Sequence, residues 1–252
     1  MAPRFDIFIC GGSQHVAMLR PLLAKLQPFG RVHLASCFLS GDDLEQLHGL
    51  YDVLHEPRHS ENGYHNFELF SIRDMHRLAT APYFVKLDAD IELADDWISY
   101  VDDCIAARSD AVLFGPRQGN SDVTLELSGG LVRDLLGHDV RVARGPKIIG
   151  GFYVGKTEFF RQHARFMEVA HELLWCFRDG ERVRPSPYPQ HWPARPARKT
   201  MHAGGNVETF RTIGNEDTLR SLLVHAVGAS DRLHVFDSRG KVRIYRTNTV
   251  NP

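Results

Sequence analysis

The sequence predicts an α/β fold in which a central, mostly parallel sheet is covered by helices on both faces. Strand-like and helix-like segments alternate four times in the first 115 residues, a rhythm typical of parallel strands joined by crossover helices. The second half is less regular and contains short segments that favour antiparallel strands. We therefore expect a Rossmann-like three-layer sandwich with a small antiparallel part toward its C-terminal end.

Each expected element follows from the spacing of apolar residues and from the glycines and prolines that interrupt it. In the first half we expect strands at 5–10, 32–39, 53–54, 83–87 and 111–114, and helices at 14–28, 43–51, 66–79 and 95–107. In the second half we expect short strands at 123–127 and 140–142, helices at 157–177 and 216–227, and a terminal hairpin of 233–236 with 241–245. Residues 178–200, rich in proline and cations, predict an ordered loop or a mobile flap.

Length and composition narrow the class of protein. The chain has 252 residues, which suits one α/β domain over 1–252. Its 30 basic and 31 acidic residues nearly cancel, which argues against a nucleic-acid or anionic-membrane partner recognised by bulk charge. No apolar run approaches the ~20 residues of a membrane span, and the first residues lack the apolar core of a signal peptide.

The four cysteines are Cys10, Cys37, Cys104 and Cys176, and no two of them form a CxxC pair. This spacing favours reduced thiols and no thiolate zinc site. We therefore expect a cytoplasmic protein, and its oligomeric state stays open.

Two carboxylates and a lysine follow one another on the expected strand at 83–87 and just beyond it. Residues two apart on a strand share a face, so Lys86, Asp88 and Asp90 are expected to point together. Ligands of open α/β sheets sit at the carboxyl ends of strands, and paired carboxylates suit Mg²⁺ or Mn²⁺ shared with a diphosphate. The alternative is a chance DxD that caps the following helix.

A second acidic pair, Glu216 and Asp217, opens the helix expected at 216–227. Acidic residues at a helix N-terminus are stabilised by the helix dipole, so capping around Asn215 explains them without any catalysis. The functional alternative is a general base, because a carboxylate within hydrogen-bond reach can take the proton of an attacking hydroxyl.

Three other segments contain candidate binding residues. Gly150 and Gly151 interrupt an apolar run, which predicts a bulge, a turn or a close approach of a ligand to the backbone. Asp42 and its neighbour follow the second expected strand, where either helix capping or nucleotide binding suits them. Trp192 lies in the cationic 178–200 segment, which is either a solvated loop or a lid that excludes water.

The segment from His55 to His59 matches the HExxH pattern of zinc proteases, but we interpret it as a decoy. That pattern requires both histidines on one face of a continuous helix. Pro57 lies between them, and an interior proline costs a helix about 3 kcal/mol. Most of the other histidines are isolated and are expected to be packed or solvated.

These motifs, taken in chain order, resemble those of GT-A fold glycosyltransferases, particularly the inverting enzymes of family 2 type. The matching features are the first strand and its turn (5–12), Arg73 before the DxD strand, Asp88-Ala-Asp90 with Trp97 after it, and Asn215-Glu216-Asp217 opening a late helix. The usual Pro-x-Tyr-Asn is replaced by Gly11-Gly12-Ser13-Gln14. The arginine expected a few residues into the late helix is not cleanly placed, and Arg220 is the nearest.

The resemblance implies a metal-dependent transfer of sugar from a nucleotide diphosphate, most simply UDP, to a saccharide or small-molecule hydroxyl. Residues 1–115 would form the nucleotide-binding half and residues 116–252 the acceptor-binding half. It favours Asp217 over Glu216 as base, and Gly150, Gly151 and Trp192 as substrate contacts. It also implies donor contacts by Cys10, Gly11, Gly12, Asp42, Arg73, Lys86 and Asp88, Mn²⁺ or Mg²⁺ at Asp88 and Asp90, and a C-terminal histidine, His225 or His234, as a further metal-ligand candidate.

Two alternative functions remain. A sugar-phosphate nucleotidyltransferase would need a loop rich in glycine and containing lysine directly after the first strand, and residues 11–20 lack that lysine and that glycine spacing. A non-catalytic nucleotide-sugar binding module would keep the fold and lose the chemistry.

Overall fold

The protein is described from a computed structural model. The structure describes residues 4–36, 39–57, 70–126, 142–148, 151–168, 177–178, 181–182, 195–203, 206–211, 216–236 and 242–244. Its main sheet has the strand order β12-β11-β6-β8-β4-β1-β2-β3.

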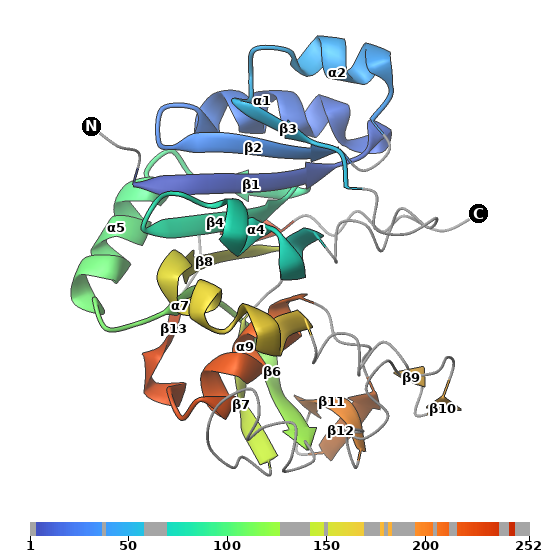
Figure 1. Ribbon diagram of the computed structural model, residues 1–252, viewed down its shortest axis with the longest axis vertical. Helices are drawn as coiled ribbons and strands as arrows, with labels where there is room; N and C mark the ends of the chain where they lie inside the picture. The colour runs from blue at the N-terminus through green and yellow to red at the C-terminus, as the bar shows by residue number, and fades with distance from the viewer. Residues whose placement is uncertain are drawn as a thin grey trace.

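The N-terminal half of the sheet is parallel. It consists of β1 (Phe5–Gly11), β2 (Arg31–Ser36), β3 (Val53–His55) and β4 (Tyr83–Asp88). β1 pairs in parallel with β2 on one side and with β4 on the other, and β2 pairs in parallel with β3. Figure 1 shows these strands as a ladder with β1 at its centre.

An antiparallel strand then joins the two halves of the sheet. β8 (Phe152–Lys156) pairs with β4 on one side and with β6 (Leu113–Glu126) on the other, antiparallel to both. β13 (Leu233–Phe236) adds to β6 in parallel. The far part of β6 pairs antiparallel with β7 (Val142–Ile148) and β11 (Arg195–Ala203), and β11 pairs with β12 (Asn206–Arg211).

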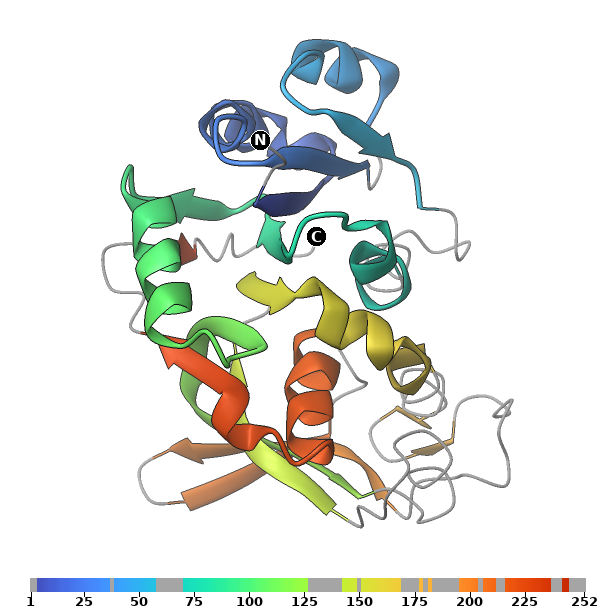
Figure 2. The ribbon, with the colours of Figure 1, turned by 60° about the vertical axis from the view of Figure 1, so that its left-hand side comes forward.

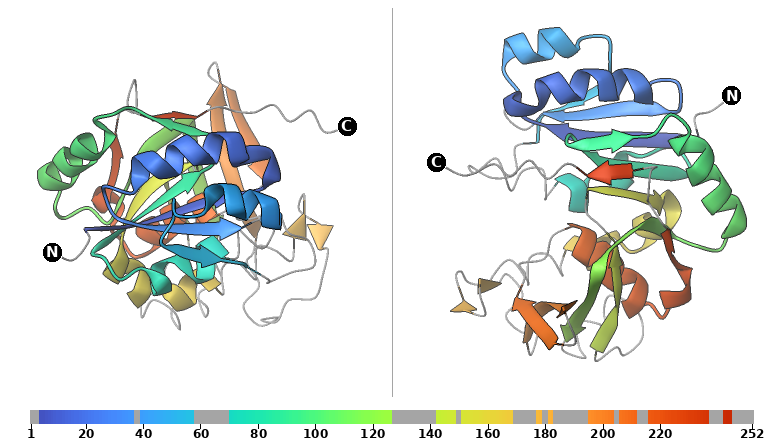
Figure 3. Two further views of the ribbon diagram at one scale, coloured as in Figure 1. Left: turned by 90° about the horizontal axis from the view of Figure 1, so that it is seen from above. Right: turned by 180° about the vertical axis from the view of Figure 1, so that it is seen from behind.

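Helices cover both faces, so the predicted α/β sandwich with an antiparallel C-terminal part is confirmed. One core lies between the sheet and α1 (Val16–Leu26) and α5 (Trp97–Ala107), with α2 (Gly41–Leu47) at its margin. The other lies under α4 (Met75–Leu78), α7 (Thr157–Gln162) and α9 (Glu216–Ala226). Figure 2 shows α5 on one side of the sheet and α4 and α7 on the other, and Figure 3 shows α1 and α5 over the rear face.

Short elements complete the described chain. They are the 3-10 turns η1 (Ser13–His15) and η3 (Ser230–Arg232), the strands β5 (Ile91–Leu93) and β14 (Val242–Ile244), and a two-stranded pair of β9 (Phe177–Arg178) with β10 (Glu181–Arg182). In the part of the chain that the structure describes, no helix has the length and apolar character needed to cross a membrane.

The expected terminal hairpin is wrong. β13 pairs with β6, whereas β14 pairs antiparallel with β5. Both segments carry the alternating pattern of a strand, but that pattern does not say which partner a strand takes. Each one instead pairs with a strand that is distant in sequence.

Three other boundaries differ from those expected. The segments expected at 111–114 and 123–127 belong to one long strand, β6, and residues 195–200, expected as loop, form the start of β11. The register of β11 against β6 shifts between Arg195 and Arg198, which accommodates Pro196 because proline cannot donate to a regular ladder. The helix expected at 157–177 breaks at His163 and resumes over 164–168, and residues 169–176 lie outside the described part.

Candidate functional site

The candidate site lies where the chain reverses its direction of travel across the sheet. From β1 the chain passes to β2 and β3 on one side, and then returns to place β4 on the other side of β1. Open α/β sheets bind ligands at such a switch point, outside the carboxyl ends of the strands. The register sets Cys10 beside Asp88 of β4 and beside Ala35 of β2, so the ends of three strands meet there.

Asp88 ends β4 and pairs with Lys86 on the same face of the strand. The Lys86 ammonium lies 2.5 Å from Asp88 Oδ1. The lysine side chain is 1% exposed and the aspartate side chain is 39% exposed. A buried ammonium requires a partner, so Asp88 compensates Lys86 and still presents part of its carboxylate outward.

Asp90 lies in the turn between β4 and β5 and is half-buried. Because β4 ends at Asp88, the alternation expected from the sequence covers Lys86 and Asp88 but does not extend to Asp90. Among the described residues, no group of three or more His, Cys, Asp or Glu side chains is arranged to hold a metal ion.

The turn after β1 is shaped by two glycines. A Cβ on Gly11 would lie 2.3 Å from Cδ1 of Leu19, so only glycine lets α1 pack this closely against the end of β1. Gly12 has extended backbone, and its N–H donates to Nδ1 of His15 at 3.3 Å. Ser13 then donates its hydroxyl to Asp43 Oδ2 at 2.5 Å, which ties this turn to the start of α2.

The start of α2 separates the roles of its two acidic residues. Ser40 caps the helix by accepting the N–H of Asp43, and Asp43 Oδ2 accepts the N–H of Ser40 at 2.8 Å. Hydrogen bonds from Ser13 and from Ser40 hold the pKa of Asp43 below its usual value. Asp42 is exposed in the first turn. The capping hydrogen bonds therefore involve Ser40 and Asp43, and nucleotide contact by Asp42 stays a prediction.

The remaining expected site residues are only partly described. Arg73 is half-buried in a helical segment over 70–73, next to the fully buried Ile72. Glu216 and Asp217 are the first residues of α9, as expected, while their side chains lie outside the described ones. Gly151 precedes β8, and its carbonyl accepts the N–H of Asp88 at 2.9 Å. Gly150 and Trp192 lie outside the described residues.

His225 and His234, the two candidates for a further metal ligand, both make contacts within the fold. Both ring nitrogens of His225 are engaged, one 2.9 Å from the carbonyl of Pro146 and the other 3.0 Å from the hydroxyl of Ser230. Neither nitrogen is then left for a metal. His234 sits on β13 with its ring against Phe114, and burial lowers its pKa.

His55, the first histidine of the HExxH decoy, lies on β3 and not on a helix, as we expected. It stacks on His33, with ring centres 5.3 Å apart, and His33 in turn lies 3.0 Å from the buried carboxylate of Asp6. Burial and the neighbouring His33 lower the pKa of His55 to about 4. No sequence pattern marks this cluster, because its members come from three different strands.

Comparison with known proteins adds likenesses of structure only. No family model matches the chain, and no curated protein sequence matches it. Three solved structures illustrate the likenesses, and all three are described as glycosyltransferases. Mouse xyloside xylosyltransferase 1 in its apo form is 11% identical, with 94% of this chain and 86% of that chain covered and a TM-score of 0.48.

The glycosyltransferase GlyE of Streptococcus pneumoniae TIGR4 is 10% identical, with 95% of this chain and 46% of that chain covered and a TM-score of 0.48. The mannosyltransferase PcManGT of Pyrobaculum calidifontis, solved with GDP-Man and Mn²⁺, is 12% identical, with 64% and 47% covered and a TM-score of 0.39. The chain thus spans about half the length of these two proteins. At such identities and TM-scores the likenesses concern the fold alone, and the function has to be inferred from the chain's own residues.

Proposed function

We propose that the chain is a metal-dependent glycosyltransferase. It would transfer a sugar from a nucleotide diphosphate, with UDP as the first nucleotide to test, to an acceptor hydroxyl. The acceptor class would be a saccharide or another small molecule. Asp217 would act as the general base, and a single displacement would invert the anomeric carbon.

The observation that carries this proposal is the position of Asp88. It ends β4 directly at the switch point, its neighbour across the ladder is Cys10 at the end of β1, and its carboxylate is partly exposed. The Gly11–Gly12 segment, where the missing side chain of Gly11 lets α1 pack close, follows at the same edge. A carboxylate, a lysine and a glycine turn at this edge suit a ligand that carries phosphates and a sugar.

The residues at this edge fit a hard divalent cation. Such a cation is usually held by one or two carboxylates and by phosphate oxygens of the substrate, and it does not need a complete cage of protein ligands. Asp88 and Asp90 supply two carboxylates of this kind, consistent with the lack of a larger ligand cluster among the described residues. The chemistry that a bound Mg²⁺ or Mn²⁺ supplies in this setting is Lewis-acid stabilisation of a leaving diphosphate.

The chain's own side chains have distinct tasks in this proposal. Arg73 would steady phosphate oxygens, and Lys86 would add positive charge from its buried position beside Asp88, since cations offset the phosphate charge. Asp217 at the start of α9 would accept the proton of the acceptor hydroxyl as it attacks. Gly150 and Gly151 would let the donor sugar approach the backbone before β8, and Trp192 would stack on a sugar ring.

The test is to identify the products formed by the purified protein. We expect UDP-sugars with Mn²⁺ and a panel of saccharide acceptors to yield free UDP and a glycoside of inverted anomeric configuration, detectable by NMR. Pyrophosphate in place of UDP would indicate nucleotidyl transfer. Tight nucleotide binding without turnover across the panel would indicate a non-catalytic module. Either of these results would overturn the proposal.

Asp217→Asn provides the sharper test of the base. We expect kcat to fall by about 10²-fold or more, because general-base catalysis contributes about 10²–10⁴-fold. Donor affinity should stay unchanged. Glu216→Gln is the matched control: it removes the same charge from the same helix end and should reduce kcat far less. Equal losses in both variants would show that the helix N-terminus as a whole, and not Asp217, matters.

A further inference from the structure

A fully buried arginine lies one turn into α9. Arg220 is 0% exposed. Its Nε donates to the hydroxyl of Tyr153 on β8 at 2.9 Å, and one terminal nitrogen donates to the backbone carbonyl of Ser71 at 2.5 Å. The Tyr153 hydroxyl also lies 3.3 Å from the hydroxyl of Ser71. One guanidinium thus connects α9, β8 and the helical segment over 70–73.

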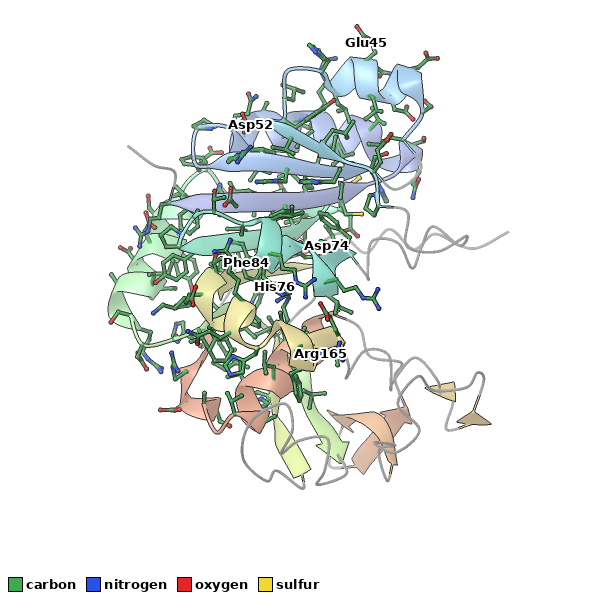
Figure 4. All side chains as sticks on the ribbon, in the orientation of Figure 1. Glu45, Asp52, Asp74, His76, Phe84 and Arg165 are labelled. Carbon is green, nitrogen blue, oxygen red and sulfur yellow. The ribbon has the colours of Figure 1, made fainter. Side chains whose placement is uncertain are left out.

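Aromatic rings surround the rest of this guanidinium. Its central carbon lies 4.7 Å from the ring centre of Phe160 on α7 and 4.9 Å from that of Phe84 on β4. The other terminal nitrogen, Nη1, is buried without a hydrogen-bond partner. Figure 4 labels Phe84, which comes from β4 in the sheet, and His76, which comes from α4 in the layer that covers this face of the sheet.

No carboxylate of the described residues forms an ion pair with Arg220. Burying a charge without an opposite charge is costly, and cation–π contacts and two hydrogen bonds offset only part of that cost. An apolar side chain of similar size would fill the same space more cheaply. The retention of a guanidinium therefore points to a task that depends on its fixed, forked geometry.

The elements that Arg220 joins are those that carry candidate site residues. α9 begins with Glu216 and Asp217, and the 70–73 segment ends with Arg73. Tyr153 is the direct cross-strand partner of Lys86 on β4. The network around Arg220 therefore ties the start of α9, which carries the candidate base, to two neighbouring elements, β8 and the 70–73 segment.

We propose that Arg220 is a positioning residue that fixes the first turn of α9 against β8 and the 70–73 segment. It would thereby hold Asp217 at a set distance from the donor bound at the end of β4. The reaction for which it positions Asp217 rests on the proposed function. Reacting groups must be held in near-attack geometry, and a misplacement of about 1 Å can cost about 10²-fold in rate.

Tyr153→Phe tests this inference with the smallest change, because it removes one hydroxyl and keeps the ring. We expect amide hydrogen exchange at residues 220–223, whose N–H groups bond to the carbonyls of the first turn of α9, to rise at least severalfold, while exchange in β1 and β4 stays unchanged. Tyr83→Phe, the same substitution at the start of β4, is the control. It should change hydrogen exchange neither in α9 nor in β1 and β4. Unchanged exchange in α9 of the Tyr153 variant would overturn the inference whether or not the protein is active.

Kinetics give the second measurement. In Tyr153→Phe we expect kcat to fall about tenfold with donor KM within about twofold, since the donor edge is built by β1 and β4. In Arg220→Met, kcat should fall further. In Arg220→Lys, which keeps the charge but not the forked guanidinium, kcat should lie between that of Arg220→Met and that of the wild type. A parallel loss of donor affinity, or normal kcat despite a loosened α9, would contradict the inference. Wild-type protein that transfers nothing would instead contradict the proposed function.

Discussion

At the scale of single residues, the most unusual group is His76 on α4. Its side chain is fully buried, and both ring nitrogens lack hydrogen-bond partners. Burial, followed by the positive charges of Arg220, Arg77 and Arg161, lowers its pKa to about 3. The folded protein therefore holds this histidine neutral, at the cost of an unsatisfied polar group in its core.

We predict that His76→Met stabilises the protein. At neutral pH the gain should be about 1 kcal/mol, the cost of an unsatisfied buried polar group. The gain should grow as the pH falls below about 6.5, because the unfolded chain then binds a proton at His76 that the folded chain refuses until about pH 3. Urea unfolding at pH 7.5 and pH 5.5 measures both effects. A destabilised variant, or a gain that does not depend on pH, would count against this explanation.

Asp6 is the opposite case, a buried carboxylate that is well satisfied. Burial alone would raise its pKa, but hydrogen bonds from His33 and from the N–H groups of Ala81 and Thr80 outweigh burial and bring the pKa to about 2. A lowered carboxylate pKa stabilises the fold above the unfolded value near 3.8. That stabilisation is lost as the pH falls toward 2.

Asp6→Asn should therefore destabilise the protein by about 2 kcal/mol at pH 7. The difference between wild type and variant should shrink between about pH 4 and pH 2. Thermal unfolding across this range provides the measurement, with the exposed carboxylate variant Asp95→Asn as control. A difference that stays constant down to pH 2 would show that ionisation of Asp6 contributes nothing.

At the scale of elements, the packing of α1 on β1 depends on one missing side chain. A methyl group on Gly11 would overlap Leu19 at 2.3 Å, and Leu19 is itself fully buried. Overpacking a core position typically costs about 1–3 kcal/mol. The turn that follows Gly11 is part of the candidate nucleotide site, so packing and binding are coupled at this point.

We predict that Gly11→Ala lowers the stability by about 1–3 kcal/mol. Adding Leu19→Ala in the same chain should cost less than the sum of the two single changes, because the smaller side chain relieves the overlap. A double-mutant cycle by chemical denaturation measures this coupling. Strict additivity would mean that the methyl group on residue 11 does not meet Leu19.

The elements also show how far the sequence alone can be interpreted. Strands and helices of the first half follow from apolar spacing, since β1 to β4 and the helices between them are local patterns of a parallel sheet. Pairing partners do not follow in the same way. Nothing local assigns β14 to β5 or inserts β8 between β4 and β6, because partner choice is decided by which edge is free when the layers assemble.

The residues of the candidate site also differ in whether the sequence alone can identify them. Asp88, Gly11 and Asp217 can be found from the sequence because local patterns mark strand ends, turns and helix starts. Arg220, Tyr153 and the Asp6–His33 pair cannot be found as partners, since they interact across 27 to 149 positions of sequence. The sequence draws attention to Arg220 only because it is the arginine nearest to the position expected in the late helix. Its burial follows from the assembled fold and is not visible in the sequence.

At the scale of the whole molecule, one sheet organises both proposed halves of the chemistry. Its parallel half ends at the switch point with Asp88. One face of the same sheet is covered by α9, which begins with the proposed base. A donor at the edge of β4 and an acceptor approaching from α9 would then meet over the same strand ends.

The most direct test is calorimetric titration of UDP into the wild-type protein and the Asp90→Asn variant, each with and without Mn²⁺. Asp90 is chosen because replacing Asp88 would also remove a carboxylate that compensates the charge of the buried Lys86. We predict that Mn²⁺ tightens UDP binding to the wild type by at least about tenfold, or 1.4 kcal/mol, and that this gain disappears in the variant while Asp95→Asn keeps it. UDP affinity that is independent of Mn²⁺, or equal in the wild type and Asp90→Asn with the metal present, would contradict the account.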